Sequence, residues 1–341
     1  MSLGRPTLGD VARLAGVHKA TASRALNSST ATRVHPETAK RVRTAADTLG
    51  YRPNMQARAL RTRSTSTIGV VVPDIVNPLY PPMVRGIEDA LSRRGYTALI
   101  ANTDLDPDRE RTALDTLLSR QVEALIVGVS DDTRALCEDL AKDGTPIVLL
   151  DNASDLDGVS GIESDNVAGV DAVVDHLVAL GHRSIAHLGG PEHMLDPPRR
   201  TAAFRAAFAR HGLDEAGCPV VSVAELTPTA AAGAVDRLLD RYPDVTAIAC
   251  YNDLLAVGAL GGLSARGLDC PADVSVVGFN DLPWVTYLTP SLTTVRVDTK
   301  QAGYAAATLL LSILDGIDGV VHQYLPVSLM PRESTGRAPV G

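Results

Sequence analysis

Cysteine, aromatic residues and long apolar runs are all scarce in this sequence. The four cysteines, at positions 137, 218, 250 and 270, include no Cys-x-x-Cys pair, so we expect buried, reduced thiols in an intracellular protein. No apolar stretch approaches the roughly 18 residues that a membrane-spanning helix needs. The N-terminus also lacks the apolar core of a signal peptide. These absences predict a cytoplasmic protein.

The sequence signatures of common enzymes are also missing. There is no Gly-x-Gly-x-x-Gly after a strand pattern, no Gly-Lys-Ser/Thr phosphate loop, no Gly-x-Ser-x-Gly elbow and no His-Glu-x-x-His. His187 and His193 have no partners at the spacing of metal ligands, and His182, just before an expected strand, suits a structural role. We therefore expect no enzyme activity, no cofactor and no metal.

Positive charge is scarce overall but concentrated near the N-terminus. The formal net charge is −8, yet residues 1–63 carry 12 Lys and Arg against 3 acidic residues, a net charge of +9. The rest of the chain must then carry −17. A basic segment on an acidic body is typical of a polyanion-binding module. A solvated basic tail is the alternative, and the helical pattern of the segment argues against it.

The basic segment has the pattern of a helix-turn-helix. Thr7 and Asp10 form a near capping box before an apolar face at i, i+3, i+4 and i+7. Gly16 is a natural end for this helix, and a second helix is expected to run to about Asn27. In such a unit the second helix enters the major groove of DNA with its N-terminus first.

The second helix carries the residues that we expect to contact DNA. Lys19 and Arg24 are long donors that can reach guanine edges, whereas Ala20 offers at most a methyl contact. The short hydroxyls of Thr21 and Ser23 suit phosphates, which position a protein without reading the base sequence. An ordinary solvated helix face is the structural alternative.

A third helix and a short basic segment complete the N-terminal region. Pro36 begins and Gly50 ends a pattern with one apolar stripe, which closes a three-helix module. Residues 55–61 favour a helix of only two turns, which needs a partner to be stable. Leu60 in this segment is a candidate minor-groove wedge or, equally, a linker leucine that packs on the body.

From residue 67 onward, short apolar runs alternate with helical patterns, which is typical of parallel sheets built from βαβ units. Two such halves predict a bilobed body. Ligands of open α/β sheets bind outside the carboxyl ends of the strands. The polar residues that follow the strand patterns are Asp74, Asn77, Asp151, Asn252, Asn280 and Asp281. Together they suit a ligand with many hydroxyls, although any single one can be a turn former or a helix cap.

Two further side chains are candidates for the same ligand site. Arg200, ahead of a helix expected to start near Ala202, can clamp a hydroxyl pair or a carboxylate. Trp284, the only tryptophan, can stack on a sugar ring or pack against the body.

Segments in order along nearly the whole chain resemble the lactose-repressor/galactose-repressor family. They are residues 8–12, 16–17, 21–27, 51–54, 68–74, 77–78, 181–186, 251–253, 275–281 and 289–295. The resemblance implies an all-α helix-turn-helix domain and an α/β bilobed, periplasmic-binding-protein-like domain with two Rossmann-like parallel-sheet subdomains. It also implies a homodimer that binds a near-palindromic operator, with a hinge helix in the minor groove.

The resemblance assigns roles to individual positions on the DNA side. Lys19, Ala20 and Arg24 match the base-reading positions, and Leu60 matches the intercalating hinge leucine. Asn54 and Arg58 complete the expected DNA contacts.

The same resemblance extends to the effector side and shows two departures. Arg200 matches the family's effector-contacting arginine, although the adjacent Arg199 leaves the register open, and Tyr80 matches an aromatic position that lines the cleft. His18 stands where the family usually has Ser, which predicts a weaker cap on the second helix. The loop over residues 27–35 is slightly long.

The combined expectation is a DNA-binding repressor, associated with the bacterial nucleoid, whose operator affinity is controlled by a sugar or sugar derivative. We expect a DNA-binding domain over residues 1–50, a hinge helix and linker over 51–66, and an effector-binding and dimerisation domain over 67–341. Within the last, the expected subdomains are about 67–160 with 293–321, and about 161–292 with 322–336. The alternatives are a solute-binding protein of a sugar transporter and an enzyme on the same fold.

Overall fold

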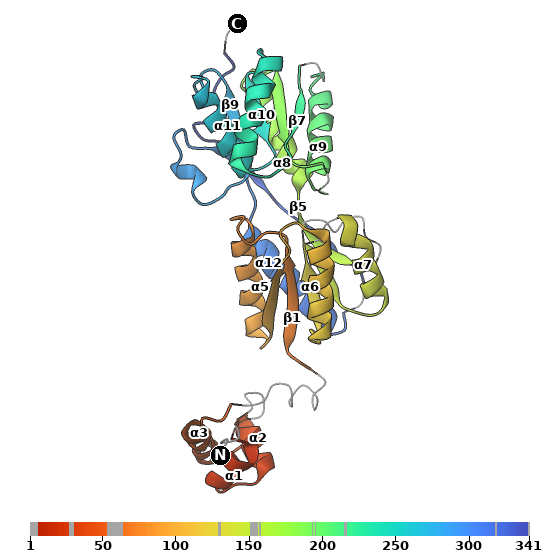
Figure 1. Cartoon of the computed structure of the whole chain (residues 1–341), viewed down its shortest axis with the longest axis vertical. Coiled ribbons are helices and arrows are strands. Elements are labelled where there is room, and N and C mark those ends of the chain that lie inside the picture. The colour runs from red at the N-terminus through yellow and green to blue at the C-terminus, as the bar shows by residue number, and fades with distance from the viewer. Residues whose placement is uncertain are drawn as a thin grey trace. The chain divides into compact units, whose positions relative to one another are not determined.

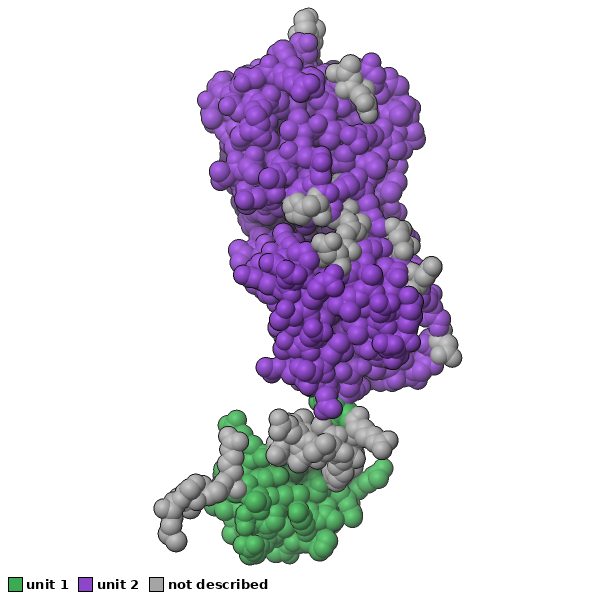
Figure 2. Space-filling model, turned by 45° about the vertical axis from the view of Figure 1, so that its right-hand side comes forward, with its two compact units in different colours: residues 1–65 green, residues 66–341 purple. Residues whose placement is uncertain are grey.

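The structure is a computed structural model. It describes residues 6–26, 31–52, 64–128, 131–150, 156, 158–192, 194, 196–214, 217–317 and 319–339. The chain forms two compact units, residues 1–65 and 66–341 (Figure 2). Within the described ranges, no helix combines the length and the apolarity needed to cross a membrane.

The small unit consists of short helices around a core of small side chains. Its elements are α1 (Leu8–Leu14), α2 (Lys19–Ala25), the 3-10 helix η1 (Ala31–Arg33) and α3 (Pro36–Leu49). The capping box at Thr7 and Asp10 is present, and Gly50 ends α3 in the left-handed conformation with φ 62°. The second helix ends at Ala25, two residues before the expected end. Val11 and Val42 are fully buried among alanines.

The first lobe of the large unit is built on a six-stranded sheet of order β11-β5-β4-β3-β1-β2, with all neighbours parallel. Its strands are β1 (Thr67–Val72), β2 (Thr97–Asn102), β3 (Ala124–Val127), β4 (Ile147–Leu150), β5 (Ser160–Ser164) and β11 (His322–Leu325). Its helices are α5 (Tyr80–Arg93), α6 (Pro107–Ser119), α7 (Asp131–Lys142) and α12 (Thr299–Leu314).

The second lobe has a six-stranded sheet of order β12-β10-β9-β8-β6-β7, in which only β12 is antiparallel to its neighbour. Its strands are β6 (Ile185–Gly189), β7 (Val220–Ser222), β8 (Ala247–Cys250), β9 (Ser275–Asn280), β10 (Thr293–Arg296) and β12 (Ser328–Met330). Its helices are α8 (Asn166–Ala179), α9 (Asp196–Arg210), α10 (Pro228–Arg241), α11 (Asp253–Ala265) and the 3-10 helix η2 (Val285–Tyr287). The predicted fold class is confirmed.

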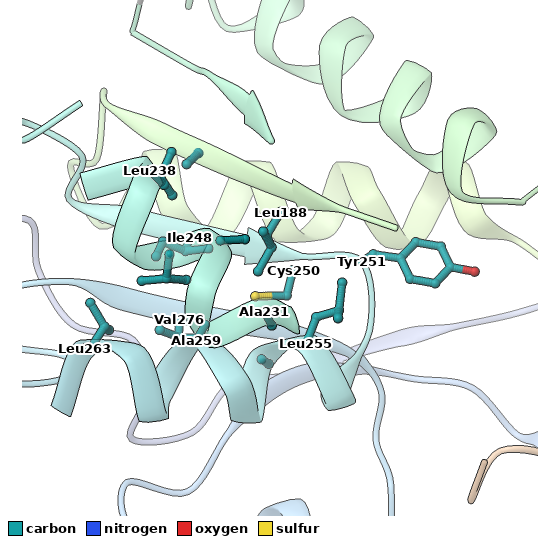
Figure 3. Close-up of a cluster of buried hydrophobic side chains, with 14 of the residues drawn as sticks. Leu188, Ala231, Leu238, Ile248, Cys250, Tyr251, Leu255, Ala259, Leu263 and Val276 are labelled. Carbon is teal, nitrogen blue, oxygen red and sulfur yellow. The ribbon is translucent and has the colours of Figure 1, made fainter. Parts of the chain in front are cut away.

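Helices cover both faces of each sheet (Figure 1). In β1, Val70 packs with α5 and α12, whereas the adjacent Val71 packs with α6 and α7, because successive strand residues point to opposite faces. In β8, Ile248 packs with α10 and α11 (Figure 3), and Ala249 packs with α8 and α9. Both faces are apolar, which explains why the strands read as continuous apolar runs in the sequence.

The cysteines are free thiols within these cores. Three are buried and Cys270 is partly buried. Burial raises the pKa of each thiol, which disfavours the reactive thiolate.

Three crossings connect the lobes: after β5, after β10, and between β11 and β12. The strands that end at a crossing run parallel to most other strands of their sheet. The carboxyl ends of these strands therefore lie at one edge of the sheet, beside the crossing. The expected subdomain boundaries were wrong here, because β10 belongs to the second sheet and β5 and β11 belong to the first. A short apolar strand beside a crossing can pair with either sheet, and only its partners decide which.

Candidate DNA-binding helix and effector site

Five of the residues predicted to contact DNA lie together on α2. Lys19, Ala20 and Arg24 are exposed, and Thr21 and Ser23 are half-buried. The opposite face carries buried alanines that pack on the other helices of the small unit. One face of α2 therefore holds the helix in the unit, and the other presents donors to the exterior.

The side chain of His18 caps α2; whether this cap is weaker than that of a serine stays a prediction. Its Nδ1 accepts a hydrogen bond from the backbone N–H of Ala20 at 3.2 Å. An imidazole that accepts at Nδ1 while neutral carries its proton at Nε2. The histidine thus replaces the serine of the family as a helix cap.

Four of the predicted site residues fall outside the described part of the chain. They are Asn54, Arg58, Leu60 and Asp151. Their roles stay predictions.

Arg200 occupies a prepared position in the second lobe. It lies within α9, which begins at Asp196 and not near Ala202 as expected. Its side chain donates to the backbone carbonyl of Tyr251 at 2.6 Å and to Oδ1 of Asn166 at 2.8 Å. Arg200 is only 6% exposed, whereas Arg199 is half-buried. Arg200 is therefore the arginine built into the interior, while its match to the family's effector-contacting arginine stays a prediction.

Two aromatic rings sandwich the guanidinium of Arg200. Its central carbon lies 4.4 Å from the ring centroid of Tyr251 and 4.0 Å from that of Phe279. Figure 3 shows Tyr251 at the end of β8, with its ring directed away from the rest of the apolar cluster. Cation–π contacts of this kind are stronger when the charge is desolvated. Sequence reasoning missed Tyr251, Phe279 and Asn166 as partners of Arg200, although each adjoins or lies within a matched or polar segment.

His187 anchors the helix that carries Arg200. Its Nδ1–H donates to the carbonyl of Ala249 at 2.9 Å, and its Nε2 lies 3.2 Å from the hydroxyl of Thr201. The ring stacks on Phe204 with the centroids 4.1 Å apart. Burial lowers the pKa of His187 to about 3, so the ring is neutral. His187 thus has a structural role between the second sheet and α9.

Asn252 and Asp253 begin α11 and are both buried. Oδ1 of Asn252 accepts from the N–H of Leu255 at 2.9 Å and caps the helix. The carboxylate of Asp253 accepts from the hydroxyl of Thr294 at 2.6 Å and from the N–H of Leu282 at 2.7 Å. Burial raises the pKa of Asp253 to about 7 despite these bonds. Asp253 is a structural acid of the second lobe.

Asn280 and Asp281, which are adjacent in the sequence, have different surroundings. Within the described ranges, the side-chain amide of Asn280 has no hydrogen-bond partner. Asp281, by contrast, accepts from Nε of Arg296 at 2.7 Å and from Nη2 of Arg332 at 2.6 Å. Each of its oxygens thus accepts from one arginine, and the role of Asp281 as an effector contact stays a prediction. Trp284 packs, partly buried, against the apolar cluster of α10 and α11.

In the first lobe, the predicted ligand residues form turns. Oδ1 of Asp74 accepts from the N–H of Val76 at 2.9 Å, and Oδ1 of Asn77 accepts from the N–H of Leu79 at 3.1 Å. Tyr80 follows as the first residue of α5 and is half-buried. Turn formation, the alternative to ligand binding, therefore accounts for one side-chain oxygen of Asp74 and for the side-chain oxygen of Asn77. Across the described residues, no group of three or more His, Cys, Asp and Glu could hold a metal ion.

Comparison with known proteins places the chain in a family. The profile of bacterial regulatory proteins of the lacI family matches residues 7–54, and that of the periplasmic binding protein-like domain matches residues 174–335. Catabolite control protein A from Priestia megaterium is 32% identical over 332 residues, which are 96% of this chain and 99% of that protein. The chain belongs to the lacI family. It is a DNA-binding transcription regulator, as the sequence predicts.

Solved structures of similar regulators match the whole architecture. The Lac repressor dimer bound to operator and the anti-inducer ONPF has a TM-score of 0.88 and 28% identity, covering 97% of this chain and 99% of that one. The transcriptional regulator CelR in complex with cellobiose has a TM-score of 0.72 and 32% identity, covering 97% and 100%. A solute-binding protein would share only the bilobed domain, so the match over residues 7–54 favours a regulator of the lacI family.

Proposed function

We propose that this lacI-family chain is a homodimeric repressor whose affinity for a near-palindromic operator is controlled by a carbohydrate. The sugar binds at the carboxyl ends of the strands, and its main contacts come from the second lobe. The protein acts in the cytoplasm, on the bacterial nucleoid, and has no enzyme activity. The observation that carries the proposal is the buried guanidinium of Arg200, held by Asn166 and two aromatic rings.

The chemistry of the strand ends suits a polyhydroxylated molecule. Arg200 supplies planar donors, Asn280 supplies a donor and an acceptor, and Nδ2 of Asn252 supplies a further donor beside them. Vicinal hydroxyls of a sugar can bond to such groups in pairs. Tyr80 and Trp284 supply apolar ring surface for the carbon face of the sugar. That CelR, with 32% identity, is known in complex with cellobiose supports the carbohydrate class.

Control of operator affinity requires that the sugar prefer one of two states of the dimer. Such a coupling is typically about 1–3 kcal/mol. The three crossings between the lobes are where a change of lobe orientation would occur. A change of this kind would alter the spacing of the two DNA-binding units in a dimer, because each unit joins the first lobe ahead of β1.

Thermal denaturation with a panel of small molecules tests the ligand class. The panel contains mono- and disaccharides, sugar acids and nucleosides, and unfolding is followed by the fluorescence of Trp284. A sugar present at 100 times its dissociation constant should stabilise the body by about 2.7 kcal/mol. Stabilisation by nucleosides, with no response to any carbohydrate, would contradict the proposed class.

Selection of bound duplexes from a random DNA library tests the DNA side. The full chain should enrich a near-palindromic sequence. Lys19→Ala and Arg24→Ala should each relax the preference at particular base pairs, at a cost of about 1–3 kcal/mol of binding free energy.

Leu60→Ala should weaken binding to the selected site more than binding to random DNA, because it removes the proposed minor-groove wedge. Equal loss on both kinds of DNA would contradict the wedge.

A further inference from the structure

The loop that follows β9 has an unusual backbone. Asn280 has a φ of 117° and Asp281 has a φ of 55°, so two consecutive residues with side chains lie in the region that favours glycine. Strained conformations of this kind persist only where the surroundings hold them in place, and they cluster at functional sites. The contacts of the loop show what holds it.

Side-chain ion pairs hold the loop at Asp281. Its carboxylate receives Arg296 on one oxygen and Arg332 on the other, and the side chain is 8% exposed. Arg332 is itself fixed, because its second terminal nitrogen donates to the carbonyl of Leu292 at 2.7 Å. A carboxylate bonded by two guanidinium groups is a strong and directional anchor. We call Asp281, Arg296 and Arg332 the clamp.

Backbone contacts hold the residues on either side of the clamp. The N–H of Leu282 donates to the buried carboxylate of Asp253 at 2.7 Å. The N–H of Asp281 lies 3.4 Å from the hydroxyl of Thr294, and the N–H of Val297 lies 3.5 Å from the carbonyl of Asn280. Each residue from 280 to 282 thus has at least one contact that restricts it, while the amide of Asn280 remains without a partner among the described residues.

Groups that hold the proposed effector contacts adjoin two of the crossings. Arg296 is the last residue of β10, just before the crossing to α12. Arg332 follows β12, which the chain enters directly from β11 of the first lobe. Asn166, which bonds Arg200, begins α8 just after the crossing from β5. The crossings after β5 and after β10 thus each adjoin a side chain that fixes a proposed effector contact or its neighbour, whereas Arg332 lies beyond the far end of β12 from the third crossing.

We infer that Asp281 is a positioning residue, which holds the backbone of Asn280 so that its amide faces the effector and ties this amide to the crossing after β10. The role of Asn280 as a ligand contact rests on the proposed function, whereas the holding of its backbone does not. All three clamp residues belong to the second lobe, and Arg296 adjoins the crossing after β10, so a change at that crossing would reach Asn280 through Asp281. The clamp thus links the effector site to this crossing.

Hydrogen–deuterium exchange of the full chain, without any ligand, tests the clamp. Asp281→Asn keeps the shape of the side chain and removes its charge. We expect roughly tenfold faster exchange at the amides of residues 281, 282 and 297, and unchanged exchange in β8. The control is Asp236→Asn, which removes an exposed partner of Arg266 in the same lobe and should leave these amides unchanged. Unchanged exchange in Asp281→Asn, or a uniform increase over the lobe, would overturn the inference.

A double substitution tests whether Asp281 and Arg332 act as one unit. If they do, Asp281→Asn combined with Arg332→Gln should exchange no more than about twofold faster than Asp281→Asn alone. Effects that multiply would show two independent contacts and overturn the clamp.

A crystal structure of Asp281→Asn supplies a readout that a loss of general stability would not change. We expect Asn280 to leave the positive-φ region, and a retained φ near 117° would contradict the positioning role. None of these measurements uses a sugar, so failure of the clamp is distinguishable from failure of the proposed ligand class.

Discussion

The two lobes carry similar polar residues at equivalent strand ends but use them differently. In the first lobe, Asp74 and Asn77 are half-buried and bond to the backbone of their own turns. In the second lobe, Arg200 and Asn252 are almost fully buried; Arg200 bonds to other elements, whereas Asn252 caps its own helix α11. The residue type alone does not decide whether a polar group shapes a loop or prepares a site. Burial and the origin of the partner decide it.

This difference assigns the two lobes unequal parts in binding. A side chain fixed before the ligand arrives loses little conformational freedom on binding. We therefore propose that the second lobe supplies the pre-formed contacts and that the first lobe supplies groups that adjust. The following predictions test this asymmetry.

The largest effect is expected at Arg200. Arg200→Ala should weaken binding of the sugar found in the panel by at least ~100-fold, because it removes a desolvated, charge-assisted donor group. Arg199→Ala is the matched control on the same helix and should change affinity by less than about threefold. Isothermal titration calorimetry measures both. Equal losses of sugar affinity in the two variants would contradict a special role of Arg200 over Arg199.

The pH dependence of stability should expose the buried histidine of the second lobe. The pKa of His187 is lowered to about 3, so its contribution to stability is present above the ordinary pKa of 6.5 and is lost as the pH falls from there towards 3. The slope of the free energy of unfolding against pH should approach about 1.4 kcal/mol per pH unit. Urea unfolding followed by Trp284 fluorescence should show a flatter slope for His187→Gln.

Asp253 acts in the opposite direction and must be separated from this effect. Its pKa is raised to about 7, so its contribution is present at low pH and is lost as the pH rises through 7. The difference between the wild type and His187→Gln at each pH isolates the histidine. An identical slope for both proteins between pH 6.5 and 5 would show that His187 does not titrate as the burial requires.

A smaller effect is expected at the buried cap of α11. Asn252→Ala should lower the free energy of unfolding by about 1–2 kcal/mol, because it leaves the N–H of Leu255 without its acceptor in a buried place. Urea denaturation at neutral pH measures the loss. A change below 0.3 kcal/mol, on the order of the measuring error, would indicate that another acceptor takes over.

The smallest effect is expected in the first lobe. Asn77→Ala should change the free energy of unfolding by no more than about 0.5 kcal/mol, because its turn lies at a solvent-accessible loop. The same denaturation experiment makes the comparison with Asn252→Ala direct. If the two variants lost equal stability, the contrast between the lobes would not hold.

Local signals in the sequence were sufficient for the small unit and for the fold class. The capping box at Thr7, the glycine after α3 and the alternation of strand and helix patterns each depend on neighbours in the chain. The assignment of β10 and β11 to the wrong lobes failed, because it depends on strand partners far away in the sequence. The ion pair of Asp281 with Arg332, 51 residues away, could not be predicted for the same reason. The burial that distinguishes Arg200 from Arg199 likewise appears only in the packed helix.

The most direct test of the account is the operator affinity of the wild type and Arg200→Ala, measured by fluorescence anisotropy with the selected duplex at fixed salt, with and without the sugar. We expect the sugar to change the wild-type affinity by about 5- to 150-fold and to leave Arg200→Ala unchanged, while the two proteins bind the duplex equally without sugar. An undiminished response in Arg200→Ala, or a wild type that responds to no sugar that it binds, would contradict a carbohydrate-controlled regulator with its effector site in the second lobe.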